Sequence, residues 1–195
     1  YLHVRNDWLA RHTEPILEPD LPIIDPHHHL WDRQGWRYML DDLLADTASG
    51  HNILATVFVQ ARSIYRADGP DELKPIGETE FVNGAAAMAA SGRYGKIKAC
   101  EGIVSRADLS LGSAVGRVLD AHIAAGNGRF RGIRHSSPWD ADKEVAGIYA
   151  ERPKGLLLDP NFRKGFACLA PLGLSFDGWL FFTQLESKLR IGVFK

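Results

Sequence analysis

The sequence contains no apolar run long enough to cross a membrane, no signal-peptide pattern at its start and no N-x-[ST] glycosylation site. Its two cysteines, Cys100 and Cys168, are too few for a disulfide framework, so we expect free, mostly buried thiols. A formal net charge of −1 gives no indication of binding to nucleic acid or to an anionic membrane. We therefore expect a cytoplasmic protein.

Strand-like and helix-like segments alternate along the chain. With 195 residues, 45% of them hydrophobic, it is long enough to bury a core. The predicted strands are 22–25, 53–59, 96–105, 130–135 and 174–181. The predicted helices are 38–48, a segment around 81–89, 110–125 and 161–170. This alternation implies βαβ units and a parallel sheet, so the fold class is α/β.

The clearest helix is predicted over 110–125. It carries an apolar stripe at helical spacing, formed by Leu111, Val115, Val118, Leu119, His122 and Ile123. Asp108 or Ser110 can cap its start, and Gly126 is expected to end it. Before the first strand, residues 1–21 are polar and contain two prolines, which predicts an N-terminal arm.

The segment 23–32, Ile-Ile-Asp-Pro-His-His-His-Leu-Trp-Asp, is the most informative one. Side chains at i and i+2 of a strand point the same way, so His27 and His29 can converge on one ion or substrate atom. Asp25 shares their parity, and His28 points to the opposite face. From spacing alone, a pair of satisfied core histidines is about as good an interpretation as a pair of ligands.

This segment resembles the first-strand H-x-H signature of the amidohydrolase-2 family, metal-type hydrolases built on a (β/α)₈ TIM barrel. The resemblance runs from Asn6-Asp7-Trp8 to Gln184-Leu185. It passes through Gly77-Glu78-Thr79-Glu80-Phe81, Gly102-Ile103-Val104, Phe130-Arg131-Gly132-Ile133-Arg134-His135 and Gly173-Leu174-Ser175-Phe176-Asp177. Composition and periodicity alone would instead favour a complete five-stranded doubly wound sheet. The resemblance argues for the barrel.

Five strand–helix units do not complete a barrel of eight, which typically takes about 250 residues. We therefore expect a barrel domain over 22–185 that is truncated after about five units, followed by an atypical tail over 186–195. A frameshift, a premature stop or an incomplete gene model would explain such a truncation. Such a sheet would expose two edges and invite self-association. An inactive fragment is one alternative to an enzyme.

By resemblance, His27 and His29 would ligate a divalent cation, with Zn²⁺ the expected metal. Members of this family draw another His and a general-base Asp from later strands, which this chain is expected to lack. Some relatives hydrolyse lactones without a metal, and in them the histidines would orient a substrate carbonyl.

Four further residues are candidates for substrate binding. Arg134 and His135 end the strand at 130–135, and a guanidinium there suits a carboxylate or carbonyl. Arg131 has the opposite parity to Arg134 and is expected to form a surface salt bridge. Gln60 follows the second strand and can hydrogen-bond a substrate or cap backbone groups. Asp177 lies within an apolar strand, so it must be paired or functional.

The resemblance implies attack of water on a lactone or related carbonyl of a small carboxylated or sugar-derived molecule. Related barrels decarboxylate aromatic acids, which provides a second possible reaction. Where relatives carry Tyr-His-Pro-Gln after the fifth strand, this chain has Phe181-Phe182-Thr183-Gln184. That difference removes one histidine that could contact substrate.

Overall fold

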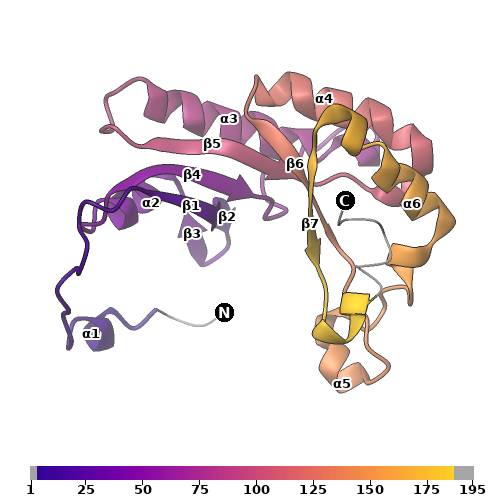
Figure 1. The fold of residues 1–195 in the computed structure, drawn as a ribbon, viewed down its shortest axis with the longest axis horizontal. Helices are drawn as coiled ribbons and strands as arrows, with labels where there is room; N and C mark the ends of the chain where they lie inside the picture. Colours follow the sequence, from indigo (N-terminus) through magenta and orange to yellow (C-terminus); the bar gives the residue numbers. More distant parts are fainter. Residues whose placement is uncertain (1–3, 187–195) are drawn as a thin grey trace.

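The computed structural model describes residues 4–186 as a curved parallel sheet with helices along its outer side (Figure 1). The sheet strands, in spatial order, are β1 (Ile23–His28), β4 (Ile53–Val59), β5 (Lys98–Ser105), β6 (Phe130–Ser136) and β7 (Ser175–Trp179). All neighbouring pairs are parallel. A separate antiparallel hairpin consists of β2 (Trp31–Arg33) and β3 (Trp36–Tyr38).

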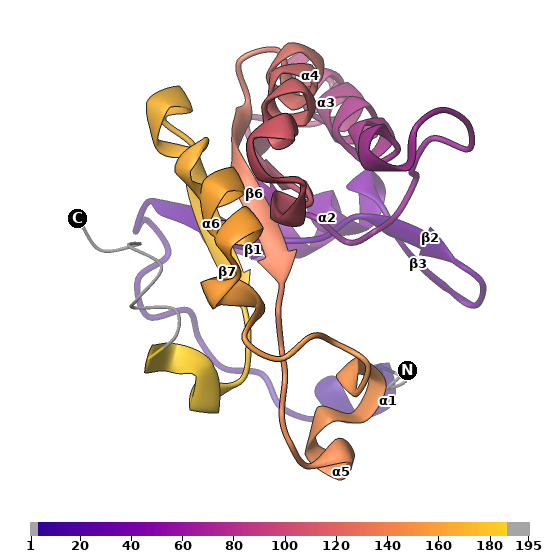
Figure 2. The same ribbon diagram turned by 90° about the vertical axis from the view of Figure 1, so that its right-hand side faces the viewer.

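Most of the helices lie between successive strands of the sheet in the chain. The α-helices are α1 (Asn6–Leu9), α2 (Leu40–Thr47), α3 (Ile76–Ala90), α4 (Gly116–Gly126), α5 (Lys143–Ala146) and α6 (Pro160–Ala167). Short 3₁₀ segments are η1 (Asp71–Leu73), η2 (Leu109–Val115), η3 (Gly147–Tyr149), η4 (Leu156–Leu158), η5 (Ala170–Leu172) and η6 (Phe182–Gln184). Figure 2 shows α6 beside β7, with α5 beyond the end of the sheet.

The strand order separates the two architectures that the sequence left open. A doubly wound sheet reverses its strand order at a switch point and carries helices on both faces. Here each strand lies next to the preceding strand of the sheet without reversal, and α3, α4 and α6 lie along the outer side (Figure 1). The wall of a barrel is built in this way. The described residues therefore form a five-stranded parallel half-barrel sheet, consistent with part of a TIM barrel.

The hydrophobic core lies between the sheet and its outer helices. One buried cluster contains Phe58, Val82 and Ile103, and a second contains Leu119 and Phe162. All five side chains are fully buried. Burying a side chain of this size stabilises the fold by about 1.5–3 kcal/mol. These contacts fix the helices to the strands, so the strand ends are held in place from the outside.

A buried chain of hydrogen bonds also joins α3, β5 and α4. His122 Nε2 lies 3.0 Å from the Arg106 carbonyl oxygen, and a carbonyl only accepts, so Nε2 carries the proton. His122 Nδ1 therefore accepts from the Thr79 hydroxyl at 2.8 Å. Ser105 then donates its own hydroxyl proton to Thr79. Burial lowers the pKa of His122 to about 4. This series of hydrogen bonds forms only while the histidine is neutral, because a protonated Nδ1 could not accept from Thr79.

The helix predicted over 110–125 is divided in two. Its first part is the 3₁₀ segment η2, and α4 begins only at Gly116. The cause is Gly112, whose φ of 60° lies outside the right-handed helical region. Asp108 caps the start, since its carboxylate accepts from the Ser110 N–H at 3.0 Å. At the other end Asn127 adopts the left-handed conformation that terminates many helices.

The β2–β3 hairpin was not predicted from the sequence. Each of its strands has three residues, which is too short for a period of two to be recognised. Its two indole rings, Trp31 and Trp36, pack together with centroids 4.1 Å apart. The hairpin follows β1 directly, so it places an aromatic ring beside the histidines of that strand.

Both ends of the described chain lie outside the sheet. Residues 4–21 contain the short helix α1 and are mostly exposed. Of the tail predicted over 186–195, Glu186 is described and the remainder lies outside the described residues. None of the helices between residues 4 and 186 combines the length and apolar composition needed to span a bilayer.

Candidate active site

The histidine pair lies at the carboxyl end of β1. His27 Nε2 and His29 Nε2 are 3.2 Å apart, and their rings meet edge to face. His28 points to the other face, where its Nε2 lies 2.9 Å from the Thr56 hydroxyl. The Asp25 carboxylate forms a hydrogen bond within its own strand, accepting from the His27 backbone N–H at 3.0 Å. The i, i+2 parity of the strand thus brings the two imidazoles together, as the sequence predicted.

Two contacts fix the orientation of His29. Its Nδ1 lies 2.6 Å from the carbonyl oxygen of Val59, at the end of β4. Since a carbonyl only accepts, Nδ1 carries the proton and Nε2 keeps its lone pair. The imidazole also stacks on Trp31, with 25° between the ring planes. Burial lowers the pKa of His29 and so favours the neutral ring. His29 therefore presents a lone pair towards His27.

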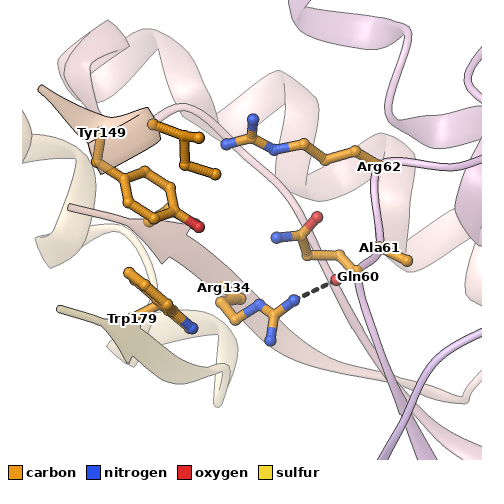
Figure 3. A pocket seen from close by; sticks show the side chains of 8 residues that line it. Gln60, Ala61, Arg62, Arg134, Tyr149 and Trp179 are labelled. Atoms are coloured by element: carbon orange, nitrogen blue, oxygen red, sulfur yellow. Dashed lines mark hydrogen bonds between the residues drawn. The ribbon is translucent and has the colours of Figure 1, made fainter. Parts of the chain in front are cut away.

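Arg134 of β6 links the histidine pair to two other strands. Its Nη1 lies 3.4 Å from His27 Nε2, and its Nη2 donates to the Gln60 carbonyl oxygen (Figure 3). Asp177 occupies the paired position on β7. Burial lowers the pKa of Arg134, and the charge of Asp177 acts in the opposite direction. Arg134 Nε is buried and has no hydrogen-bond partner within residues 4–186, so one donor of the guanidinium is unpaired.

A pocket of about 190 Å³ opens beside Arg134 (Figure 3). Arg62 and the buried Gln60 approach it from the loop after β4, and Tyr149 and Trp179 form the opposite side. The rings of Tyr149 and Trp179 are 4.9 Å apart. Gln60 Oε1 has no hydrogen-bond partner in the described part of the chain. The pocket thus combines two guanidinium groups with aromatic walls, a lining that suits a small anionic molecule with an apolar body.

The structure does not bring His135 to this pocket. His135 packs edge to face against Phe162 of α6, with ring centroids 5.0 Å apart, and is 3% exposed. Burial lowers its pKa to about 4. Successive strand residues point to opposite faces, so His135 and Arg134 cannot share one. Arg131 also lies away from the pocket, where its Nη1 donates to the Gly128 carbonyl oxygen at 2.6 Å.

The three pocket side chains that the function proposed below would use but that were not predicted from the sequence are those of Arg62, Tyr149 and Trp179. Arg62 lies two positions after Gln60 in the same strand-end loop, and that position was a usable signal, because barrel sites are built from such loops. Tyr149 lies in the long segment after β6, where no local pattern singles it out. Trp179 ends β7, where no sequence pattern distinguishes a pocket tryptophan from one that packs in a core.

The positions of the His27 and His29 nitrogens can be compared with the coordination geometry of a divalent cation. Two nitrogen ligands of a tetrahedral Zn²⁺ lie about 3.3 Å apart, close to the 3.2 Å between His27 Nε2 and His29 Nε2. Metal-bound histidines also commonly donate their other N–H to a backbone carbonyl, as His29 does to Val59. Within residues 4–186 no cluster of three or more His, Cys, Asp or Glu side chains could hold a metal. The pair therefore fits two positions of a coordination shell and not a complete one.

Comparisons with known proteins support an amidohydrolase-like fold. No model of a protein family matches the chain. A curated relative, the uncharacterized protein y4mH of Sinorhizobium fredii, is 32% identical in an alignment that covers 88% of this chain and 58% of that protein. Among solved structures, the chain is similar to a zinc-bound amidohydrolase from Burkholderia multivorans, with a TM-score of 0.54 and 25% identity over 84% of this chain.

A second crystal structure of an amidohydrolase from Burkholderia multivorans, with bound HEPES, gives a TM-score of 0.52 at 22% identity and supports the fold. The chain covers 51% and 52% of the chains in these two structures. It therefore spans little more than half the length of the curated relative and of the solved neighbours.

Proposed function

We propose that this chain belongs to the amidohydrolase family and forms part of a hydrolase in which water attacks the carbonyl of a lactone or a related ester or amide. The observation that carries the proposal is the pair His27 and His29, whose Nε2 atoms converge at the carboxyl end of β1. Enzymes built on a (β/α)₈ barrel carry out their chemistry at that end of the strands. The similarity to the zinc-bound amidohydrolase of Burkholderia multivorans supports the assignment.

His27 and His29 would hold a divalent cation, with Zn²⁺ the best match to two imidazole nitrogens. Such a cation polarises a carbonyl oxygen and lowers the pKa of water towards neutrality. The remaining ligands, and an Asp acting as general base, would come from the part of the neighbours' fold that this chain does not span. In a metal-free enzyme the two imidazoles would instead orient the substrate carbonyl.

Arg134 would bind a carboxylate or carbonyl oxygen of the substrate. It is 9% exposed, it borders the pocket, and its Nε has no partner within residues 4–186. Arg62 lines the same pocket and would favour a second negative charge or an electron-rich ring substituent. Asp177, paired in register with Arg134, would hold the guanidinium in place, and Gln60 would offer its side-chain oxygen to a substrate hydroxyl. A small carboxylated lactone fits these groups.

The aromatic wall of the pocket favours a second candidate reaction. Tyr149 and Trp179 form one side, and a flat aromatic acid could stack there while Arg134 binds its carboxylate. A metal-dependent decarboxylase of aromatic acids would use the same histidine pair. The two reactions differ in their products, because one yields a ring-opened acid and the other yields CO₂.

The test is a panel of sugar lactones, carboxylated lactones and aromatic acids, supplied with and without Zn²⁺ to residues 1–195 joined to the C-terminal half of the zinc-bound Burkholderia multivorans amidohydrolase, which would provide the strands that this chain does not span. Ring opening releases a proton, which a pH indicator detects, and decarboxylation is followed as CO₂. We expect ring opening of a carboxylated lactone that is lost in His27→Ala and in His29→Ala. The exposed His51→Ala variant serves as the matched control and should keep the activity. Release of CO₂ alone would support the decarboxylase, and the absence of both reactions would overturn the proposal for this chain.

A further inference from the structure

Glu78 is a fully buried carboxylate whose partners lie far away in the sequence. It stands in the first turn of α3 with 0% of its surface exposed. Its Oε1 accepts the backbone N–H of Ala61 at 3.0 Å and that of Ser63 at 2.8 Å. Both donors belong to the loop that follows β4, 17 and 15 positions earlier in the chain. One carboxylate oxygen therefore holds two points of this loop.

The loop held by Glu78 is the one that presents groups to the candidate site. The Gln60 carbonyl oxygen accepts from Arg134, and the Ala61 carbonyl oxygen accepts from Arg33. Gln60, Ala61 and Arg62 all border the pocket (Figure 3). The position of this short loop therefore decides where the Arg134 guanidinium lies relative to His27.

The conformation of the loop is not one that these residues prefer. Arg62 and Ile64 have φ angles of 58° and 55°, in the left-handed region that non-glycine residues rarely occupy. The loop also presses against the start of α3. A Cβ on Gly77 would lie 2.7 Å from the Arg66 nitrogen and 2.8 Å from the Ile64 oxygen. A loop of this kind persists only where surrounding groups hold it, and Glu78 supplies two such contacts.

An acidic residue in the first turn of a helix has an ordinary explanation, which is its favourable interaction with the helix dipole. An exposed side chain achieves this at little cost. Glu78 is instead removed from water, and its Oε2 has no hydrogen-bond partner within residues 4–186. Burial raises its pKa to about 7. A buried carboxyl with one unsatisfied oxygen is expensive, so the helix dipole alone does not account for its presence.

We infer that Glu78 is a positioning residue that clamps the Ala61 and Ser63 amides, so that the Gln60 carbonyl holds the Arg134 guanidinium at the site and the Ala61 carbonyl holds that of Arg33 over the Trp31 ring. The positioning role of Glu78 is argued from its hydrogen bonds to the loop. Only the binding of substrate by Arg134 rests on the function proposed above. Glu78 acts through the loop, because it does not line the pocket. What matters is the reach of its acceptor oxygen rather than its charge.

Two conservative substitutions distinguish the effect of the Glu78 side-chain length from the effect of its charge. Glu78→Gln keeps an acceptor oxygen at the same distance from the backbone, whereas Glu78→Asp keeps the charge and shortens the side chain by one methylene. Amide hydrogen exchange of the full chain, resolved by NMR, reports the Ala61 and Ser63 bonds directly. Asp120→Asn, an exposed carboxylate on α4, is the control.

We expect Glu78→Gln and Asp120→Asn to retain the exchange protection of Ala61 and Ser63. In Glu78→Asp both amides should exchange about tenfold faster, the loss expected from one hydrogen bond. The buried Leu119 amide in α4 should be unchanged. The Arg134 side-chain Nε–H resonance should move in Glu78→Asp and not in Glu78→Gln.

Three results would overturn the inference. Loss of protection in Glu78→Gln with retention in Glu78→Asp would mean that charge is what matters. Equal loss at Leu119 would mean a general loss of stability, and unchanged exchange in both variants would mean that the loop holds itself. None of these measurements needs a substrate. A positive exchange result in a protein without lactone hydrolysis would thus leave the clamp standing while the proposed function failed.

Discussion

Arg134 Nη1 lies 3.4 Å from His27 Nε2, although the two residues are 107 positions apart in the chain. A guanidinium has no lone pair and can only donate, so this contact is a hydrogen bond in the His27 tautomer protonated on Nδ1; in the other tautomer His27 Nε2–H donates to His29 Nε2. His29 Nε2 also carries a lone pair, because its Nδ1–H is bonded to Val59. In the first of these tautomers two lone pairs face each other across 3.2 Å. A cation held by both nitrogens would relieve that repulsion.

We therefore expect Zn²⁺ to bind the protein at this pair. His27→Ala and His29→Ala should each weaken the affinity by about tenfold or more, as removal of a metal ligand or its support commonly does. Competition with a chromogenic chelator measures the affinity. His51→Ala, which changes an exposed histidine far from the pair in sequence, is the control. Equal Zn²⁺ affinity in the unsubstituted protein and in all three variants would show that the metal binds elsewhere or not at all.

Replacing Arg134 by Lys should weaken the binding of small carboxylates. The lysine keeps the charge but cannot contact the Gln60 carbonyl and His27 while also donating to a ligand in a planar fork. A drop of about tenfold in the affinity for benzoate or malonate is expected, measured by isothermal titration calorimetry. Arg131→Lys provides a matched control, because Arg131 lies on the same strand and faces away from the pocket. An equal drop in both variants would mean that net charge alone governs the binding.

The free energy of unfolding should fall as the pH is lowered from about 6.5 to about 4. Burial lowers the pKa of His28, His122 and His135 to about 4 each from 6.5. Over that window the unfolded chain binds more protons than the folded one, which destabilises the fold. Glu78 acts in the opposite direction, because its pKa is raised to about 7 and its contribution to stability is lost as the pH rises from 4.5 towards 7.

Urea unfolding at several pH values measures this dependence. In His122→Gln the difference in unfolding free energy between pH 6.5 and pH 4 should be smaller by about 3 kcal/mol, since one pKa unit corresponds to about 1.4 kcal/mol. The exposed His12→Gln variant should leave the difference unchanged. A pH dependence that is the same in both variants would contradict the assignment to His122.

We also expect the protein to self-associate through the edges of its sheet. Within residues 4–186, β1 and β7 each pair with a neighbouring strand on one side only. Unpaired strand edges offer backbone donors and acceptors to another copy. Sedimentation velocity should show a sedimentation coefficient that rises with concentration, and Ile24→Lys, at a residue of β1 that is 63% exposed, should reduce the rise. A single monomeric species at every concentration would argue against this expectation.

The sequence was most informative where a pattern is local. The apolar run 53–59 predicts β4, because near-continuous apolar runs are typical of parallel strands, although Leu54 is 47% exposed in the half-barrel. The approach of His27 to His29 follows from strand parity alone. The same parity separates His135 from Arg134, and only the packing of His135 against Phe162 made that consequence evident.

Contacts between distant residues could not be predicted in the same way. Glu78 has the local signature of an ordinary residue in a first helical turn, and its partners Ala61 and Ser63 are identified only once α3 packs on the sheet. Tyr149 reaches the pocket through an irregular segment with no period to recognise. Tertiary packing, rather than local preference, decides which of these side chains meet.

The uninterrupted strand order has a consequence for how the chain is made. During translation, β4 can pair with β1 as soon as it leaves the ribosome, and β5, β6 and β7 can each be added to the edge that the previous strand has just formed. No strand has to wait for a later one to be inserted between it and its neighbour. Domains that grow in this order can acquire structure from the N-terminus while synthesis continues. The growing edge is then always the most recently synthesised strand, and it is the part of the nascent protein that a chaperone would most need to cover.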